Sequence, residues 1–158
     1  MKNTFKRSGT ALISLVLLLV LAVSASAASS QNVGVKFWKE RSDKESMANS
    51  GIDPDRTATL TRQANGTYTL TLPVMQVSKL GVTGYLSGLT IGDVTYDGTL
   101  TGDFNKATAV LTIKNLPASV LTGSDSNKAL AVTCSIKMDT ILLGDITTSA
   151  KMSIWVEH

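Results

Sequence analysis

Threonine alternates with aliphatic residues through most of this 158-residue chain, and this two-residue period constrains the fold more than any other feature. Side chains of a β-strand point alternately to opposite faces, so the pattern predicts strands with one buried and one polar face. The segments with clear or weaker alternation are 32–39, 56–63, 67–74, 82–89, 94–100, 108–113, 130–138 and 147–156. Short strands without a long helix predict an all-β, immunoglobulin-like antiparallel β-sandwich of seven or eight strands.

The residues between these segments predict how the strands are connected. Asn65-Gly66 predicts a two-residue hairpin turn, because both residue types tolerate a positive φ angle. Pro73 has no N–H to donate, so its strand is expected to lie at an edge or to end there. Asp97-Gly98 predicts another tight turn, and residues 117–121 predict one short helical turn.

Residues 42–52, SDKESMANSGI, are the one place where the alternation fails. Helix-forming residues at the centre of this segment predict a short helix or 3₁₀ turn near the N-terminus. Asp43 is the expected cap, since its carboxylate can accept a backbone N–H two or three residues further on. Gly51 is expected to end the turn, because glycine adopts the left-handed conformation readily.

Residues 1–27 have the three parts of a secretory signal peptide. Three basic residues lie within the first seven, residues 11–23 form an apolar run broken by one serine, and Ala25-Ser26-Ala27 matches a signal peptidase site. A bilayer needs a helix of about twenty apolar residues, which is longer than this run. We therefore expect residues 28–158 to form one mature domain, an uncleaved membrane anchor being the alternative.

The charge of the mature domain excludes one class of partner. Removal of residues 1–27 takes away three of the 15 basic residues, and the remaining 12 balance the 12 acidic ones. Nucleic-acid-binding proteins need clustered positive charge, and these basic residues are scattered. Cys134 is the sole cysteine, so no intramolecular disulfide can form. We expect a secreted or cell-surface protein without a stable membrane span after cleavage, from an exporter poor in disulfides such as many Gram-positive bacteria.

The residue types of catalytic and metal sites are scarce, so we expect that the protein is not an enzyme. The sole histidine is His158 at the chain end, and Cys134 lies on an apolar strand face, as a packing thiol would. HExxH, GxSxG and P-loop motifs do not occur. Asp93, Asp97 and Asp103 lie near glycines, and we interpret them as turn residues, a calcium site being the alternative.

The segment 44–49, KESMAN, stands between the first strand and the strand at 56–63. This arrangement resembles the opening of NEAT (near iron transporter) domains of Gram-positive bacteria. The resemblance is clearest over residues 33–72 and continues as strand order to Trp155. It implies an immunoglobulin-like sandwich with a surface pocket for haem. It also implies that Ser46 and Met47 form a lip over this pocket and that the final hairpin forms its floor.

The chain departs from the NEAT pattern at the iron ligands. Haem-binding members carry Tyr-x-x-x-Tyr on the last strand, and a phenolate is a suitable ligand for ferric iron. Counting back from Trp155, those two positions fall near Asp145 and Ser149, and no tyrosine follows Tyr96. The tyrosine chemistry is therefore not expected here.

Other residues near the final hairpin are candidates for holding haem. Met138 and Met152 carry thioethers, which can be axial ligands of haem iron, with core packing as the alternative for both. Lys137 and Lys151 lie on the opposite strand faces and could pair with propionates, with exposure to solvent as the alternative.

Two functions are therefore expected from the sequence. The first is a ligand-binding domain for haem or iron acquisition, whose partner is haem or a haem-carrying protein. The second is a non-catalytic interaction or adhesion module that contacts other envelope proteins and binds no haem. One fold hosts many functions, so the fold does not decide between them.

Overall fold

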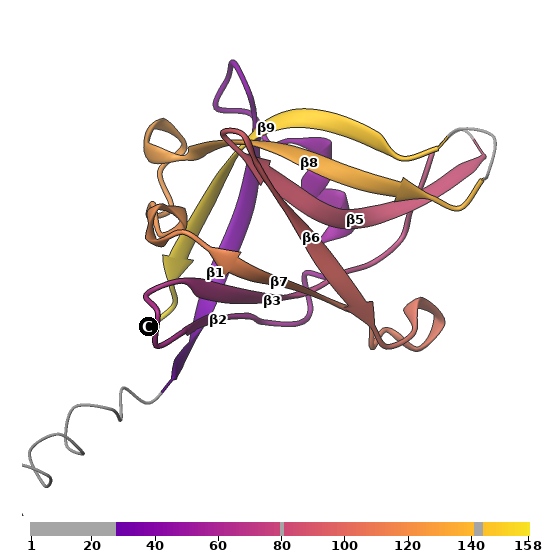
Figure 1. Cartoon of the computed structure of the whole chain (residues 1–158). Coiled ribbons are helices and arrows are strands. Elements are labelled where there is room, and N and C mark those ends of the chain that lie inside the picture. Colours follow the sequence, from indigo (N-terminus) through magenta and orange to yellow (C-terminus); the bar gives the residue numbers. More distant parts are fainter. Residues whose placement is uncertain (1–27, 80, 141–143) are drawn as a thin grey trace, which may run out of the picture.

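The computed structural model describes residues 28–79, 81–140 and 144–158, and the predicted signal peptide lies outside these residues (Figure 1). The described strands are β1 (Ser29–Lys39), β2 (Ala58–Arg62), β3 (Tyr68–Pro73), β4 (Val77–Lys79), β5 (Val82–Ile91), β6 (Val94–Thr101), β7 (Val110–Leu116), β8 (Leu130–Met138) and β9 (Ile146–Val156). The described 3₁₀ helices are η1 (Met47–Gly51), η2 (Phe104–Lys106), η3 (Ala118–Val120) and η4 (Ser126–Lys128). None of the short helices in the described ranges has the length and apolar run needed to cross a bilayer.

Eight of the strands close into one antiparallel sheet (Figure 1). The hydrogen-bonded order is β5-β6-β7-β3-β2-β1-β9-β8, and β8 pairs back with β5. The predicted all-β antiparallel fold of seven or eight strands is confirmed. The additional strand β4 was not predicted from the pattern, and it pairs with the start of β5. Closure pairs most strand edges within the molecule, which removes sites for pairing with other chains.

Aliphatic side chains fill the inside of this sheet, as the alternation predicted. Burial of each large aliphatic or aromatic side chain contributes about 1.5–3 kcal/mol to folding. Threonines lie on the other face: Thr59, Thr71, Thr112 and Thr99 are successive register partners across β2, β3, β7 and β6. The largest fully buried side chains are Phe37, Leu60, Leu70, Leu72, Leu89, Leu111, Ile113, Leu116, Met152, Ile154, Val33 and Val74.

The β2–β3 hairpin forms where predicted but has a longer loop. The N–H of Gly66 donates to the carbonyl of Gln63 at 3.0 Å, and the N–H of Gln63 donates to the carbonyl of Thr67 at 2.8 Å. Gly66 has a φ of 84°, so the loop has three residues, with glycine in the left-handed position. The Asn65 carboxamide oxygen accepts from the N–H and hydroxyl of Thr67 at 3.0 and 2.7 Å, which stabilises this loop.

The tight turn predicted at Asp97-Gly98 is wrong, because both residues lie inside β6. The chain turns instead at Gly92, whose φ is 59°, between paired residues Ile91 and Val94. Gly98 is close to β7, and a Cβ atom there would overlap the side chain of Leu111. This glycine therefore allows close packing of two strands.

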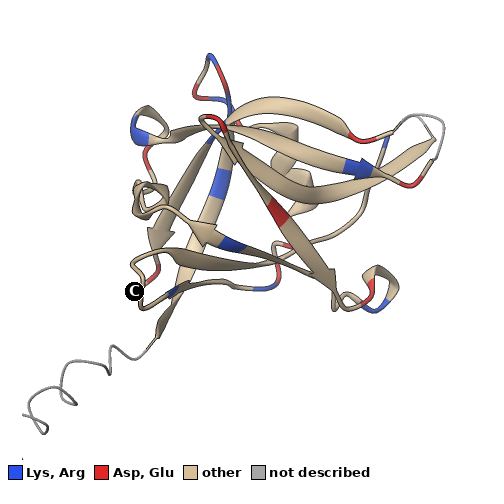
Figure 2. Ribbon diagram, viewed as in Figure 1, with Lys and Arg blue, Asp and Glu red and all other residues tan. Residues whose placement is uncertain are grey.

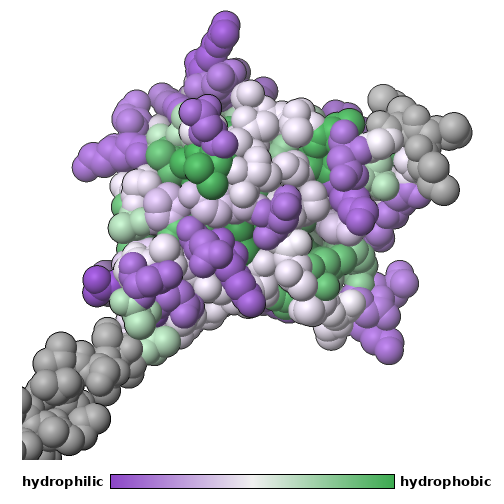
Figure 3. Space-filling model, in the orientation of Figure 1, coloured by the Kyte–Doolittle hydropathy of each residue, from purple (hydrophilic) through white to green (hydrophobic). Residues whose placement is uncertain are grey.

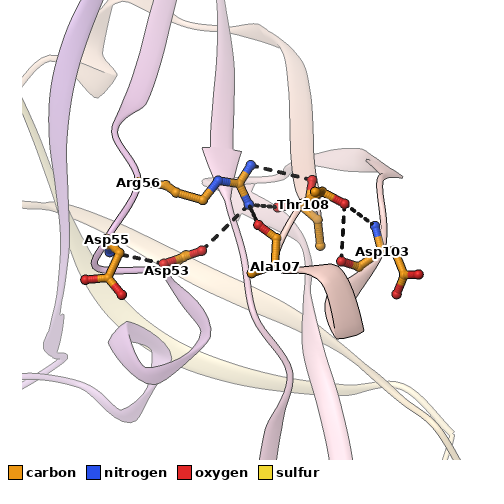
Figure 4. Close-up of polar contacts among 7 residues, drawn as sticks. Asp53, Asp55, Arg56, Asp103, Ala107 and Thr108 are labelled. Atoms are coloured by element: carbon orange, nitrogen blue, oxygen red, sulfur yellow. Dashed lines mark hydrogen bonds and ion pairs between the residues drawn. The ribbon is translucent and has the colours of Figure 1, made fainter.

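Arg56 joins the loop before β2 to the segment before β7 (Figure 4). Its guanidinium group donates to the carbonyls of Ala107 and Ala109 at 2.9 and 3.0 Å and to that of Thr108 at 3.5 Å. It also lies 3.6 Å from the carboxylate of Asp53. Because these three acceptors belong to the main chain, the cluster is a structural clamp.

The aspartates considered for calcium are separated in the structure. The Asp103 carboxylate caps η2 by accepting from the N–H of Asn105 at 2.9 Å, and Asp97 lies in β6. Within the described residues, no three His, Cys, Asp or Glu side chains lie together as a metal site requires.

Charged and apolar residues are both dispersed over the molecule. Basic and acidic segments are interspersed along the ribbon in Figure 2. On the face seen in Figure 3, apolar patches are separated by hydrophilic side chains.

Candidate functional site

The segment predicted to form a short helical turn contains η1, and we call residues 46–51 the lip. Ser46 caps η1, its hydroxyl accepting from the N–H of Ala48 at 3.3 Å. The prediction of Asp43 as the cap is wrong. Asp43 instead accepts from the Ser126 hydroxyl at 2.8 Å and lies 3.7 Å from the ammonium of Lys151. A bridge between Glu45 and Trp38 keeps the chain paired with β1 until just before the lip.

The lip is fastened to the sheet on both sides. The Asn49 side-chain oxygen accepts from the N–H of Phe37 and its amide nitrogen donates to the carbonyl of Phe37, each at 2.7 Å. Asn49 thus acts as a strand partner for β1 beyond Val33, where the pairing of β1 with β2 ends. On the other side, the carbonyl of Gly51 accepts from the N–H of Met75 at 3.0 Å.

A groove of about 300 Å³ lies between the lip and strands β4, β5, β8 and β9. Its lining is largely aliphatic, with a lysine and two methionines. The lining residues are Ser46, Met47, Ala48, Gly51, Val77, Lys79, Val82, Gly84, Tyr85, Leu86, Ile136, Met138, Ile146 and Thr148.

The strand register explains why these residues share one face. Residues directly opposite each other on paired strands point to the same side of a sheet. Gly84 is opposite Met138, Leu86 is opposite Ile136, and Ile136 is opposite Ile146. The same face continues inward along β8 and β9 to the buried core. The groove is therefore an outward continuation of the interior, covered by the lip.

Ser46, Met47 and Met138, three of the residues predicted for the site, line the groove together. Met152 lies on the same face but deeper, opposite Phe37, with no exposed surface. It is a core residue because the closed sheet surrounds it.

The two lysines predicted for the site lie away from the groove lining. Lys137 is exposed and lies opposite Tyr85, on the face of the sheet that points away from the groove. Lys151 neighbours Met152 in β9 and therefore points to the opposite face, where its ammonium group pairs with Asp43.

Lys79 is the groove residue that the sequence analysis missed most clearly. It lies at the end of β4, on the groove side, and its ammonium nitrogen is 3.4 Å from the sulfur of Met47. A three-residue strand is too short to show a period, so the pattern gave no sign of it. Lys79 supplies the positive charge of the groove lining.

Ile146 and Thr148 of β9 face the groove, next to the positions that counting had placed at Asp145 and Ser149. A shift of one residue along a strand exchanges its two faces, so a count from Trp155 could not settle which pair faces inward. Tyr85 borders the groove from β5, where its neighbours Gly84 and Leu86 face inward. Its ring lies 5.2 Å from that of Phe104.

The groove lining is largely apolar, and Lys79 and Tyr85 are the ionisable residues among its described members. The lining residues that the structure describes include no histidine, cysteine or carboxylate. The Ser46 hydroxyl is occupied in capping η1. An apolar floor with one lysine at its edge suits a flat apolar molecule that carries an anionic group.

Cys134 is fully buried on β8, opposite Thr148, as the packing interpretation predicted. Burial disfavours the thiolate and raises the pKa of Cys134 from 9.0 to about 12. The folded state therefore keeps a proton that the unfolded chain loses above pH 9. Stability is fully present below that pH and decreases as the pH rises toward 12.

We expect the free energy of unfolding to fall, relative to Cys134→Ala, by about 1.4 kcal/mol per pH unit across this range. Denaturant unfolding of both proteins at several alkaline pH values measures the difference. A constant difference would show that the thiol ionises equally in the folded and unfolded states. A thiol reagent should label Cys134 only after denaturation.

Comparison with solved structures supports a NEAT-like fold. The NEAT5 domain of IsdX2, a B. anthracis haemophore solved with haem, has a TM-score of 0.54 and 11% identity, covering 84% of this chain and 99% of that one. A mutant of IsdX2-NEAT5, also with haem, has a TM-score of 0.53 and 10% identity, covering 84% and 98%. No family model matches the chain, and no curated protein matches its sequence.

Proposed function

We propose that this protein is an exported haem-binding domain that takes part in haem or iron acquisition, and that the groove under the lip is its binding site. The observation that carries the proposal is the location of the groove. It lies between the Ser46–Met47 lip and the β8–β9 hairpin, the two elements that the sequence resemblance implied. The NEAT-like fold and the haem bound by the two solved neighbours support haem as the ligand.

The groove residues suit the chemistry of a tetrapyrrole. Leu86, Ile136 and Ile146 form an apolar floor for the flat ring, and the lip covers it from the other side. The ammonium group of Lys79 is suited to pair with a propionate carboxylate, which is the role that the sequence analysis assigned to Lys137 and Lys151.

Addition of hemin to the purified mature domain tests the proposal. We expect a Soret band that saturates at one equivalent and remains with the protein through gel filtration. Thr148→Arg places a cation in the apolar floor and should weaken binding at least about tenfold. Thr147→Arg is the matched control, because Thr147 is exposed and points to the opposite face of β9.

A hemin spectrum that the wild-type protein changes neither before nor after reduction with dithionite would contradict the proposal. The second candidate function, a non-catalytic interaction or adhesion module, would then be favoured. One observation supports it. Met47 and Ile146 line the groove yet remain 57% and 44% exposed, and such exposed apolar side chains are typical of protein contact sites. Equal loss of binding in Thr147→Arg and Thr148→Arg would place the haem elsewhere.

A further inference from the structure

The groove offers an unusual set of donor atoms to a metal at the centre of a tetrapyrrole. Among the described lining residues there is no imidazole, thiolate or carboxylate. Tyr85 borders the groove, but it is the register partner of the exposed Lys137 and its ring packs against Phe104. The sulfur atoms of Met47, from the lip, and Met138, from the floor, are the polarizable donors of the groove. They belong to elements on opposite sides of the groove.

Gly84 determines where the Met138 thioether lies. The two residues are register partners on β5 and β8. A Cβ atom on residue 84 would come within 2.8 Å of the Met138 sulfur. Because Gly84 has no side chain, the Met138 sulfur can lie on the groove floor next to it.

The Met47 side chain can reach a ligand from the lip side of the groove, opposite Met138. It is 57% exposed, and its sulfur accepts from the ammonium group of Lys79 at 3.4 Å. The Met side chain has three rotatable bonds and adapts to a neighbouring group at low cost. Hydrogen bonds of the Ser46 and Asn49 side chains hold the backbone of the lip that carries Met47.

Two separate physical effects favour ferrous over ferric haem in this groove. Thioethers are soft and uncharged, and methionine ligation raises the reduction potential of haem. Ferric haem also carries one more positive charge than ferrous haem. An apolar groove in which Lys79 is the sole charged residue of the described lining disfavours that extra charge.

We propose that this groove selects ferrous over ferric haem, with Met138 and Met47 as the axial donors. This inference rests on the proposed haem-binding function and specifies its ligand. A phenolate site is expected to prefer ferric haem. Here the donors are neutral sulfur atoms, one on β8 and one on the lip, so the expected preference is reversed.

Anaerobic titration of the mature domain with haem, with and without dithionite, tests the preference. We expect ferrous haem to bind at least about tenfold more tightly, which raises the potential of the bound haem by at least about 59 mV over free haem. Met138→Leu should lower ferrous affinity at least about tenfold and change ferric affinity less than about threefold. The ferrous spectrum should change from six-coordinate to five-coordinate in this variant.

Matched controls separate ligation from packing. Met152→Leu makes the same change in the core, and Met75→Leu makes it at an exposed methionine beside the lip. Both should keep the wild-type preference, while Met47→Leu should reduce it. Equal affinities for the two oxidation states, or an unchanged ferrous affinity in Met138→Leu, would overturn this inference and leave haem binding standing. Absence of binding in both states would overturn the proposed function itself.

Discussion

Replacement of Arg56 by methionine is expected to lower the free energy of unfolding by about 3 kcal/mol, and the melting temperature by about 10 °C. The guanidinium group is the donor for three successive carbonyls, of Ala107, Thr108 and Ala109. Methionine preserves much of the aliphatic stem but removes the donor of the Ala107 and Thr108 carbonyls, while the Ala109 carbonyl keeps the N–H of Val74. Hydrogen bonds to a charged group contribute about 1.5–3 kcal/mol each, and solvent compensates part of the loss at this half-exposed site.

Two further variants make the Arg56 prediction specific. Arg62→Met changes an exposed arginine of β2 and should leave stability within about 0.5 kcal/mol of wild type. Arg56→Lys keeps the charge but not the planar fork, so it should recover only part of the loss. Thermal and denaturant unfolding measure all three. Similar stabilities for Arg56→Met and Arg62→Met would show that the clamp contributes nothing.

Replacement of Asn49 by alanine is expected to lower stability by about 2 kcal/mol and haem affinity at least about tenfold. The Asn49 side chain makes two hydrogen bonds of 2.7 Å with the backbone of Phe37, and these hold the lip against β1. Loss of both removes the partner of the partly buried Phe37 N–H, while the Phe37 carbonyl keeps the N–H of Ser46. The lip then covers the groove less firmly, and ligand contacts must order it on binding.

Asn105→Ala is the matched control for this experiment, since Asn105 is an exposed residue of η2. It should change neither stability nor haem affinity. Calorimetry and hemin titration give the two readouts separately. A variant Asn49→Ala that is destabilised but binds haem with wild-type affinity would show that the position of the lip does not matter for the ligand.

The alternation of threonine with aliphatic residues predicted the fold class, because a two-residue period is a local property of strands. The alternation is a poor guide where the sheet is irregular. A bulge between Leu86 and Gly88 shifts the β5–β8 register, so Leu86 and Leu89 both face inward although three positions apart. This irregularity explains why the segment at 82–89 showed only weak alternation.

The candidate site was only partly predictable for a different reason. Ser46, Met47 and Met138 were identified because they lie in the lip and final hairpin that the resemblance implied. Lys79, Ile146 and Thr148 reach the groove through the pairing of β4 with β5 and the register of β8 with β9. Register depends on contacts between distant segments, and composition or spacing within one segment does not determine it.

The cap of η1 shows how tertiary contacts override local preference. Asp43 is as good a cap as Ser46 by residue type. The carboxylate of Asp43 is engaged by Ser126 and Lys151, more than eighty residues away in the chain. The turn therefore begins only after Glu45 has paired with β1.

The two-sided fastening of the lip, through Asn49 to Phe37 and through Gly51 to Met75, has a kinetic consequence. A groove whose lip is held in place by these hydrogen bonds requires no lid movement before a planar molecule enters. Capture is then governed by diffusion to the opening, and how long the cargo stays depends on its escape rate. If the groove binds haem as proposed, association should therefore be fast, and differences in affinity should come mainly from the dissociation rate.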